Sequence, residues 1–166
     1  MPKIRQHESV GTEYLHASRR LLVLRHDIPA SADDLFRCLA DADSWTRWFG
    51  FDAVTYTSDE PHGVGTTRTV QVGRNSIEEE FLIWDPGRQL CFRIERSTLP
   101  IAAMVEDYRI EKVDDDRCVL EWTVALTGRP GLISPLLRVV LRVQGQRAFR
   151  KLAHHVQIER ARYRSH

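Results

Sequence analysis

The amino-acid sequence predicts an α+β fold in which a curved antiparallel sheet of about seven strands wraps around one long C-terminal helix, with two short helices after the first strand. Three observations predict it. Apolar and polar residues alternate through residues 51–126, two short helical patterns follow a first strand, and residues 135–162 form one amphipathic helix. The 166 residues suffice for one domain with a substantial core. We expect a polar arm over residues 1–18 and a single domain over residues 19–166.

Local signals predict the first strand and the two short helices. Residues 19–27 hold a run of leucine and valine that is typical of a strand. Ser31 is an N-cap for the first helix, and Asp34 stands at the reciprocal position of a capping box. In the second helix Trp45 and Trp48 lie three residues apart and so share one face. These two tryptophans either pack under the sheet edge or form an aromatic clamp at the mouth of a cavity.

Six further strands follow from the alternation. They are predicted at about 51–58, 66–73, 75–85, 89–97, 102–113 and 117–127. The connections between them are short and hold turn residues, as at Asp85-Pro86-Gly87-Arg88, so successive strands should be antiparallel neighbours. Leu120, Trp122 and Val124 alternate with residues such as Glu121 and Thr123. One face of the sheet is therefore expected to be apolar and the other to face water.

The last helix is predicted from Pro135 to about Arg162. Ser134 supplies its N-cap, and Pro135 falls at the first helical position, where the missing N–H costs nothing. Gly145 separates two apolar faces that are offset around the helix. They comprise Leu136, Leu137, Val140, Leu141 and Val143 in the first half, and Ala148, Phe149, Leu152 and Val156 in the second. Gly145 allows either a bend in the helix or a close approach to a strand.

Several short segments resemble one protein family in their order and spacing. They are Ile28-Pro29-Ala30 through Leu35-Phe36, Trp45 with Trp48, Gly63 with Gly65, and Asp85-Pro86 with Arg88. They resemble the START-like (SRPBCC) superfamily, specifically the bacterial polyketide cyclase/dehydrase and lipid-transport family. The resemblance implies the helix-grip fold, with a cavity for a small apolar molecule between the sheet and the last helix. The chain departs from the family at Asp114-Asp115-Asp116, where the family often has a Gly-Gly-Thr turn.

Bulk properties exclude several classes of function. The formal net charge of +1 gives no global field for binding DNA, and no apolar run is long enough to cross a membrane. The three cysteines fit neither a zinc site nor a disulfide framework. We therefore expect no metal, no cofactor and no transmembrane segment. Reduced cysteines and the lack of a secretory signal predict the cytoplasm. The oligomeric state is left open between monomer and homodimer.

Two carboxylates are predicted to face the interior. Glu79 shares a strand face with Ile77, Phe81 and Ile83, and Glu106 falls among Met104, Tyr108 and Ile110. Burial in an apolar cavity raises the pKa of a carboxyl group and fits it for general acid or base chemistry. A β-bulge would instead turn either side chain toward solvent.

Other side chains are predicted to contact a ligand in the same cavity. Arg68 either pairs with an inward glutamate, holds a ligand carboxylate, or lies at the rim of the sheet. The expected lining is Phe81, Phe92, Tyr108, Trp122, Leu137 and Leu141. Tyr108 and Trp122 either donate hydrogen bonds there or belong to the core. Gln144 falls in the apolar stripe of the last helix, where its amide reaches a ligand or a strand carbonyl.

Three functions follow from these features. The leading interpretation is the binding of a small hydrophobic molecule of polyketide, lipid or quinone type, without catalysis. The alternative is a cyclase or dehydratase, of lyase or isomerase type, with Glu79 or Glu106 as general base. The third is a partner-binding role toward anionic lipid or RNA. It would use the basic outer side of the last helix, formed by Arg142, Arg147, Arg150, Lys151, Arg160, Arg162 and Arg164.

Overall fold

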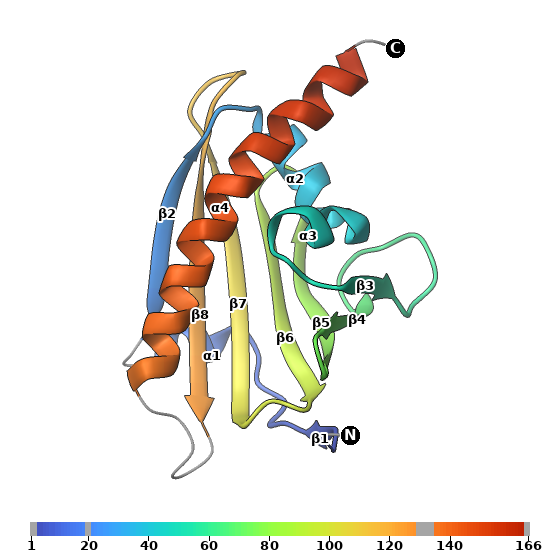
Figure 1. Cartoon of the computed structure of the whole chain (residues 1–166), viewed down its shortest axis with the longest axis vertical. Coiled ribbons are helices and arrows are strands. Elements are labelled where there is room, and N and C mark those ends of the chain that lie inside the picture. The colour runs from blue at the N-terminus through green and yellow to red at the C-terminus, as the bar shows by residue number, and fades with distance from the viewer. Residues whose placement is uncertain (1–2, 19–20, 129–134, 165–166) are drawn as a thin grey trace.

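One sheet and one long helix dominate the computed structural model (Figure 1). The structure describes residues 3–18, 21–128 and 135–164, with side chains left undescribed at residues 135–137 and 162–164. The sheet has the strand order β2-β8-β7-β6-β5-β4-β3, and β1 pairs with β6 outside this path. The helix α4 (Pro135–Arg164) crosses the concave side of the sheet. This is the predicted α+β helix-grip architecture.

The six strands predicted from the alternation are all present and antiparallel. They are β3 (Ala53–Tyr56), β4 (Thr67–Val72), β5 (Asn75–Asp85), β6 (Gln89–Ser97), β7 (Ile101–Lys112) and β8 (Cys118–Gly128). Each pairs with the next along the chain, as short connections require. The first strand, β2 (Leu22–Ile28), pairs with β8 and forms one edge of the sheet. The strand β3 forms the other edge, so the sheet stays open.

Two short helices follow β2 and cover part of the concave face. The helix α2 (Ala32–Ala40) begins at Ser31, whose hydroxyl accepts a hydrogen bond of 3.1 Å from the Asp34 N–H. The same hydroxyl donates to the Asp34 carboxylate at 2.7 Å. The carboxylate of Asp34 therefore bonds to the side chain of Ser31. The helix α3 (Ala42–Trp48) follows directly and buries both of its tryptophans.

Gly145 allows α4 to lie close against the sheet. A β-carbon at Gly145 would stand 2.5 Å from Cζ3 of Trp122 and 2.8 Å from Cδ1 of Leu24. Of the two predicted roles, close approach is therefore the one that the structure shows. The predicted cap residue Ser134 lies outside the described residues.

The N-terminal arm lies against the sheet. Residues Arg5–Gln6 form β1, and residues Glu13–Ala17 form the short helix α1. Leu15 of α1 packs on the convex face against Cys91, Val105 and Ala125. These small and apolar residues give the convex face a local core, where the alternation predicted contact with water. The sequence predicts a polar arm over residues 1–18, and the structure places residues 5–17 of it against this second apolar cluster.

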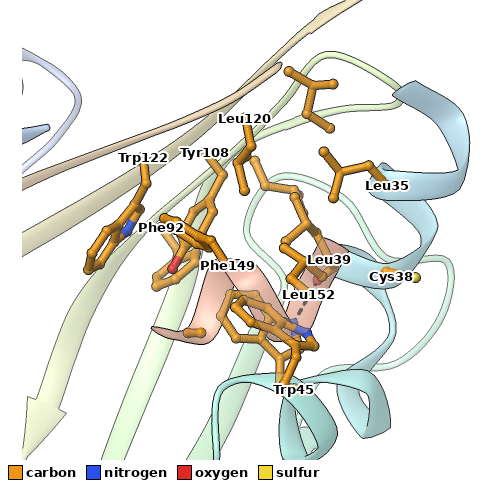
Figure 2. Packing of buried hydrophobic residues seen from close by; sticks show 14 of the residues in the cluster. Leu35, Cys38, Leu39, Trp45, Phe92, Tyr108, Leu120, Trp122, Phe149 and Leu152 are labelled. Atoms are coloured by element: carbon orange, nitrogen blue, oxygen red, sulfur yellow. Dashed lines mark hydrogen bonds between the residues drawn. The ribbon is translucent and has the colours of Figure 1, made fainter. Parts of the chain in front are cut away.

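The main core lies between the concave face of the sheet and the helices. Figure 2 shows the aromatic side chains of Phe92, Tyr108, Trp122 and Phe149 gathered there near Trp45. The helices contribute Leu35 and Leu39 from α2 and Leu152 from α4, and all three side chains are fully buried. The polar side chains considered below lie within this aromatic interior.

Candidate functional site

A buried ion pair connects two neighbouring strands inside the sheet. Arg68 on β4 stands directly opposite Glu79 on β5, and its Nε lies 2.6 Å from Oε2 of Glu79. Only 1% of Arg68 and 4% of Glu79 is exposed. Burial lowers the pKa of Arg68, but the Glu79 carboxylate and the hydroxyl groups of Tyr56 and Tyr108 together raise it by more, so the guanidinium stays charged. Burial likewise raises the pKa of Glu79, and the Arg68 charge opposes that rise.

The guanidinium of Arg68 is enclosed by aromatic rings. Its Cζ lies 4.4 Å from the ring centroid of Trp45, 5.0 Å from that of Phe81 and 4.7 Å from that of Phe92. Such contacts stabilise a cation through the negative face of each ring. The ion pair occupies only Nε, and neither Nη1 nor Nη2 makes a hydrogen bond of good geometry among the described residues, although the Tyr56 hydroxyl is close enough to interact with the guanidinium. Two buried donors therefore remain available in an apolar surrounding.

A second carboxylate lies nearby on β7. Oε2 of Glu106 accepts hydrogen bonds from the Tyr108 hydroxyl at 2.8 Å and from Nε1 of Trp122 at 2.9 Å. Burial raises the pKa of Glu106 to about 7, and the charge of Glu79 adds to the rise. The two hydrogen bonds and the Arg68 charge act in the opposite direction and are outweighed. Glu106 is partly exposed, whereas Tyr108 and Trp122 are buried, so solvent reaches the interior network at this carboxyl group.

Alternation along the strands places these residues together, and one bulge changes the pattern. Glu79 and Phe81 face the concave side as predicted. The register shifts between Phe81 and Ile83, so Ile83 joins the convex cluster and Trp84 takes the inner position. The prediction that Ile83 shares the face of Glu79 is therefore wrong. This bulge falls after Glu79. A second register shift, between Glu78 and Glu79, places its extra residue on β6, so the Glu79 carboxylate stays inside.

The predicted pocket-lining residues are mostly packed against one another. The rings of Phe81, Phe92, Tyr108 and Trp122 are at most 1% exposed. Successive centroids along this series lie 5.4, 5.7 and 6.1 Å apart. In this structure the four side chains form core, and a ligand has to displace part of it. Figure 2 shows three of them side by side.

The predicted residues of α4 differ in their placement. Leu141 is partly buried against the core, and Gln144 is exposed. Gln144 lies beside the buried face because Leu141, Gly145 and Ala148 point toward the sheet instead. Val140 and Val143 are exposed, so the first half of the helix buries fewer apolar residues than predicted. The side chain of Leu137 lies outside the described residues.

Trp45 and Tyr56 also belong to the site. Trp45 was predicted as a core residue or an aromatic clamp, and Tyr56 was not predicted. Trp45 stacks on Arg68 and donates from Nε1 to the Leu39 carbonyl at 2.8 Å (Figure 2). Tyr56 donates to the Ala40 carbonyl at 2.6 Å. Burial raises the pKa of its hydroxyl group, and the Arg68 charge opposes that rise. The predicted core role of Trp45 is confirmed, since it is 1% exposed, and its ring also covers the Arg68 guanidinium. A tryptophan on a short helix gives no sequence signal for a partner on a distant strand.

A separate hollow of about 820 Å³ lies on the surface around the β5–β6 turn and the end of β7. Its lining includes charged residues of both signs, and Arg25 there pairs with Glu111 and Glu121. None of the interior residues described above lines it. Its polar wall does not fit an apolar ligand.

Other predicted features concern metals, cysteines and membranes. In the described part of the chain, no group of three or more His, Cys, Asp or Glu side chains is arranged to hold a metal ion. Cys38, Cys91 and Cys118 are buried free thiols, and burial raises the pKa of Cys38 to about 12. Among the described residues, none of the helices has the length and apolar character needed to cross a membrane.

Comparison with known proteins places the chain in a family. Residues 21–157 match the family described as polyketide cyclase / dehydrase and lipid transport. The chain belongs to this family. Its relatives include uncharacterized proteins of Mycobacterium tuberculosis and Mycobacterium bovis, each 38% identical over 144 residues, which span 81% of this chain and 86% of theirs. The resemblance predicted from the sequence is confirmed.

Solved structures share the fold at low sequence identity. The Zhui aromatase/cyclase from a Streptomyces species superposes with a TM-score of 0.72 at 17% identity, over 83% of this chain and 93% of that one. A START superfamily protein from Mycobacterium smegmatis gives a TM-score of 0.71 at 9% identity, over 82% and 97%. At these identities the likeness concerns the fold. The family membership and the fold together support hydrophobic ligand binding or cyclase chemistry in general terms.

Proposed function

We propose that this protein binds a small, largely apolar and aromatic molecule that carries a carbonyl or carboxylate oxygen, between the sheet and α4. The observation that carries the proposal is the pair of unpartnered donors, Nη1 and Nη2 of Arg68, within an aromatic enclosure. Burying a donor without a partner costs free energy, and a hydrogen bond to a ligand oxygen removes that cost. The rings of Trp45, Phe81 and Phe92 supply the apolar contact that the rest of such a molecule needs.

The charges around Arg68 define which ligands fit. Glu79 neutralises the guanidinium through Nε, so the ligand need not carry a full charge. The two terminal nitrogens form a fork that suits two oxygens in one plane. Entry is expected at Glu106, the partly exposed member of the network. Binding must loosen the contacts among the four packed aromatic rings, which changes the fluorescence of Trp122.

The proposal is tested with 2-naphthoate and with 2-methylnaphthalene, which has the same ring system and no oxygen. Titration by tryptophan fluorescence should give a dissociation constant about tenfold lower for naphthoate, since one good hydrogen bond to a charged group contributes roughly 1.5 kcal/mol. The double variant R68M/E79M removes both charges together and should bind the two probes equally. The matched control is R96M/E78M, which removes an exposed ion pair from the same sheet.

A preference for naphthoate that persists in R68M/E79M would rule out Arg68 as the oxygen-binding group. Equal binding of both probes by the unaltered protein would do the same. Native mass spectrometry of the protein purified from its source, followed by organic extraction, then identifies the ligand class. An extracted molecule without an oxygen acceptor would contradict the proposal.

Catalysis is the second candidate function, and Glu106 is the observation that favours it. A carboxyl group with a pKa of about 7 is half ionised near neutral pH, where a general base and its conjugate acid are both available. Solvent reaches it, and two hydrogen bonds fix its orientation. Arg68 would stabilise the enolate that forms when Glu106 removes a proton beside a carbonyl.

Deuterium exchange at the carbon next to the carbonyl of α-tetralone tests this chemistry by NMR. The protein should accelerate exchange, with a rate that rises through a pH near 7. The variant E106Q should abolish the acceleration and still bind 2-naphthoate, whereas E78Q, an exposed glutamate on β5, should leave it unchanged. Equal exchange rates in E106Q and the unaltered protein would remove Glu106 as the base.

A further inference from the structure

The first half of α4 exposes an apolar surface to solvent. Val139, Val140 and Val143 are 56%, 41% and 39% exposed, although Val140 and Val143 were predicted to lie on a buried apolar face. The sheet instead receives Leu141, Gly145 and Ala148 from this part of the helix. Three neighbouring branched apolar side chains on one exposed turn are unfavourable in water unless another apolar surface covers them.

Exposed cations surround and follow these valines. Arg142, Arg147, Arg150 and Lys151 are all exposed, and none of the four forms an ion pair within the part of the chain that the structure describes. No aspartate or glutamate occurs between residues 135 and 158. Arginines elsewhere on the surface are often paired, as Arg25 is with Glu111 and Glu121. This stretch of α4 therefore creates a local positive electrostatic potential on a nearly neutral protein.

The valines and the cations share one side of the helix. Val140, Val143, Arg147 and Arg150 are spaced by three, four and three residues, which keeps them on one face. Val139 lies four residues before Val143 and adjoins it on the same side. The stripe formed by these five residues is about 17 Å long at 1.5 Å per residue. It faces away from Gly145, which packs on Trp122 of the sheet. Because α4 lies across the concave side of the sheet (Figure 1), this stripe is on the outside of the molecule.

We infer that the exposed stripe of α4 is a docking surface for an anionic phospholipid bilayer. The valines would enter the boundary between headgroups and acyl chains, and the guanidinium groups would bind lipid phosphates. The combination decides the partner. RNA would use the cations and leave the valines in water, and a second copy of this face would bring like charges together. A bilayer surface with negative lipids satisfies both halves of the stripe.

Co-sedimentation with vesicles tests the inference. The full-length protein should bind vesicles of phosphatidylcholine with 30% phosphatidylglycerol, an assay composition, and should not bind pure phosphatidylcholine vesicles. R147Q/R150Q should lower the partition coefficient roughly 25-fold, since each cation contributes about a factor of five. V139S/V143S should lower it about tenfold or more through lost apolar burial. The controls are V64S, at a valine that is 71% exposed on a loop, and R74Q in an exposed turn.

Each outcome of the vesicle experiment either supports or overturns the docking surface. Loss of binding in both stripe variants, with the two controls unchanged and circular dichroism preserved, supports the docking surface. Failure of the unaltered protein to bind anionic vesicles overturns it, as does binding that survives both stripe variants. Displacement from vesicles by stoichiometric RNA, or a dimer that V139S/V143S dissociates, would assign the stripe to a different partner. The outcome does not depend on ligand binding at Arg68.

Discussion

Replacing Glu106 by glutamine should make the protein more stable at pH 8 and leave it nearly unchanged at pH 5. The pKa of Glu106 in the folded protein is about 7, above its ordinary value of 4.5. Between these two values the folded protein holds a proton that the unfolded chain releases. The free energy of unfolding therefore falls as the pH rises from about 4.5 to about 7. Glutamine has no proton to lose and keeps an oxygen that accepts from Tyr108 and Trp122.

The gap between 4.5 and about 7 corresponds to roughly 3 kcal/mol at about 1.36 kcal/mol per pH unit. Part of this free energy is already lost at pH 5, and the partial exposure of the carboxyl group makes the total smaller. We expect the free energy of unfolding of E106Q to exceed that of the unaltered protein by about 2 kcal/mol at pH 8. At pH 5 the two should agree within about 1 kcal/mol. Urea unfolding at both values of pH measures the difference.

The comparison between the two proteins is what tests the reasoning, because other groups titrate in both. E60Q removes an exposed carboxylate from the β3–β4 loop and should follow the unaltered protein at each pH. If E106Q loses as much stability between pH 5 and pH 8 as the unaltered protein does, then Glu106 is not a buried acid of raised pKa. General base chemistry by Glu106 would then be ruled out as well.

Three further predictions concern stability. G145A should lower the free energy of unfolding, measured by thermal unfolding, by about 1 to 2 kcal/mol, because the steric clash of the new methyl group with Trp122 costs more than alanine gains in helix propensity. A stabilised G145A would show that the helix can shift. R68M should cost about 3 to 5 kcal/mol in urea unfolding because it leaves Glu79 buried and unpaired, and R68M/E79M should recover most of it; equal losses in both would mean that packing, not charge, dominates. S31A should cost about 1 kcal/mol through the lost helix cap, whereas an unchanged melting temperature would mean that water replaces the hydroxyl.

The sequence predicted the architecture because its signals are local. Alternation of apolar and polar residues marked the strands, and Ser31 marked a helix start that the structure confirms. Short connections required neighbouring antiparallel strands, which is the order observed. The inward positions of Glu79 and Glu106 also followed from alternation, because a strand repeats every two residues, whereas Arg68 was left open between the interior and the rim of the sheet. The position of Ile83 was predicted wrongly, because a β-bulge changes the two-residue repeat and has no clear signal in the sequence.

The relations between distant elements required the tertiary structure. Alternation predicted an inner face for Glu79 and allowed one for Arg68, but only the register between β4 and β5 set them directly opposite each other. The pKa of Glu106 depends on how completely neighbouring strands and helices bury it, which no local pattern records. The exposure of Val140 and Val143 was likewise decided by where Gly145 lets α4 touch Trp122. Sequence periodicity determines which face of an element is apolar, whereas burial and charge coupling depend on the partner that the fold brings to that face.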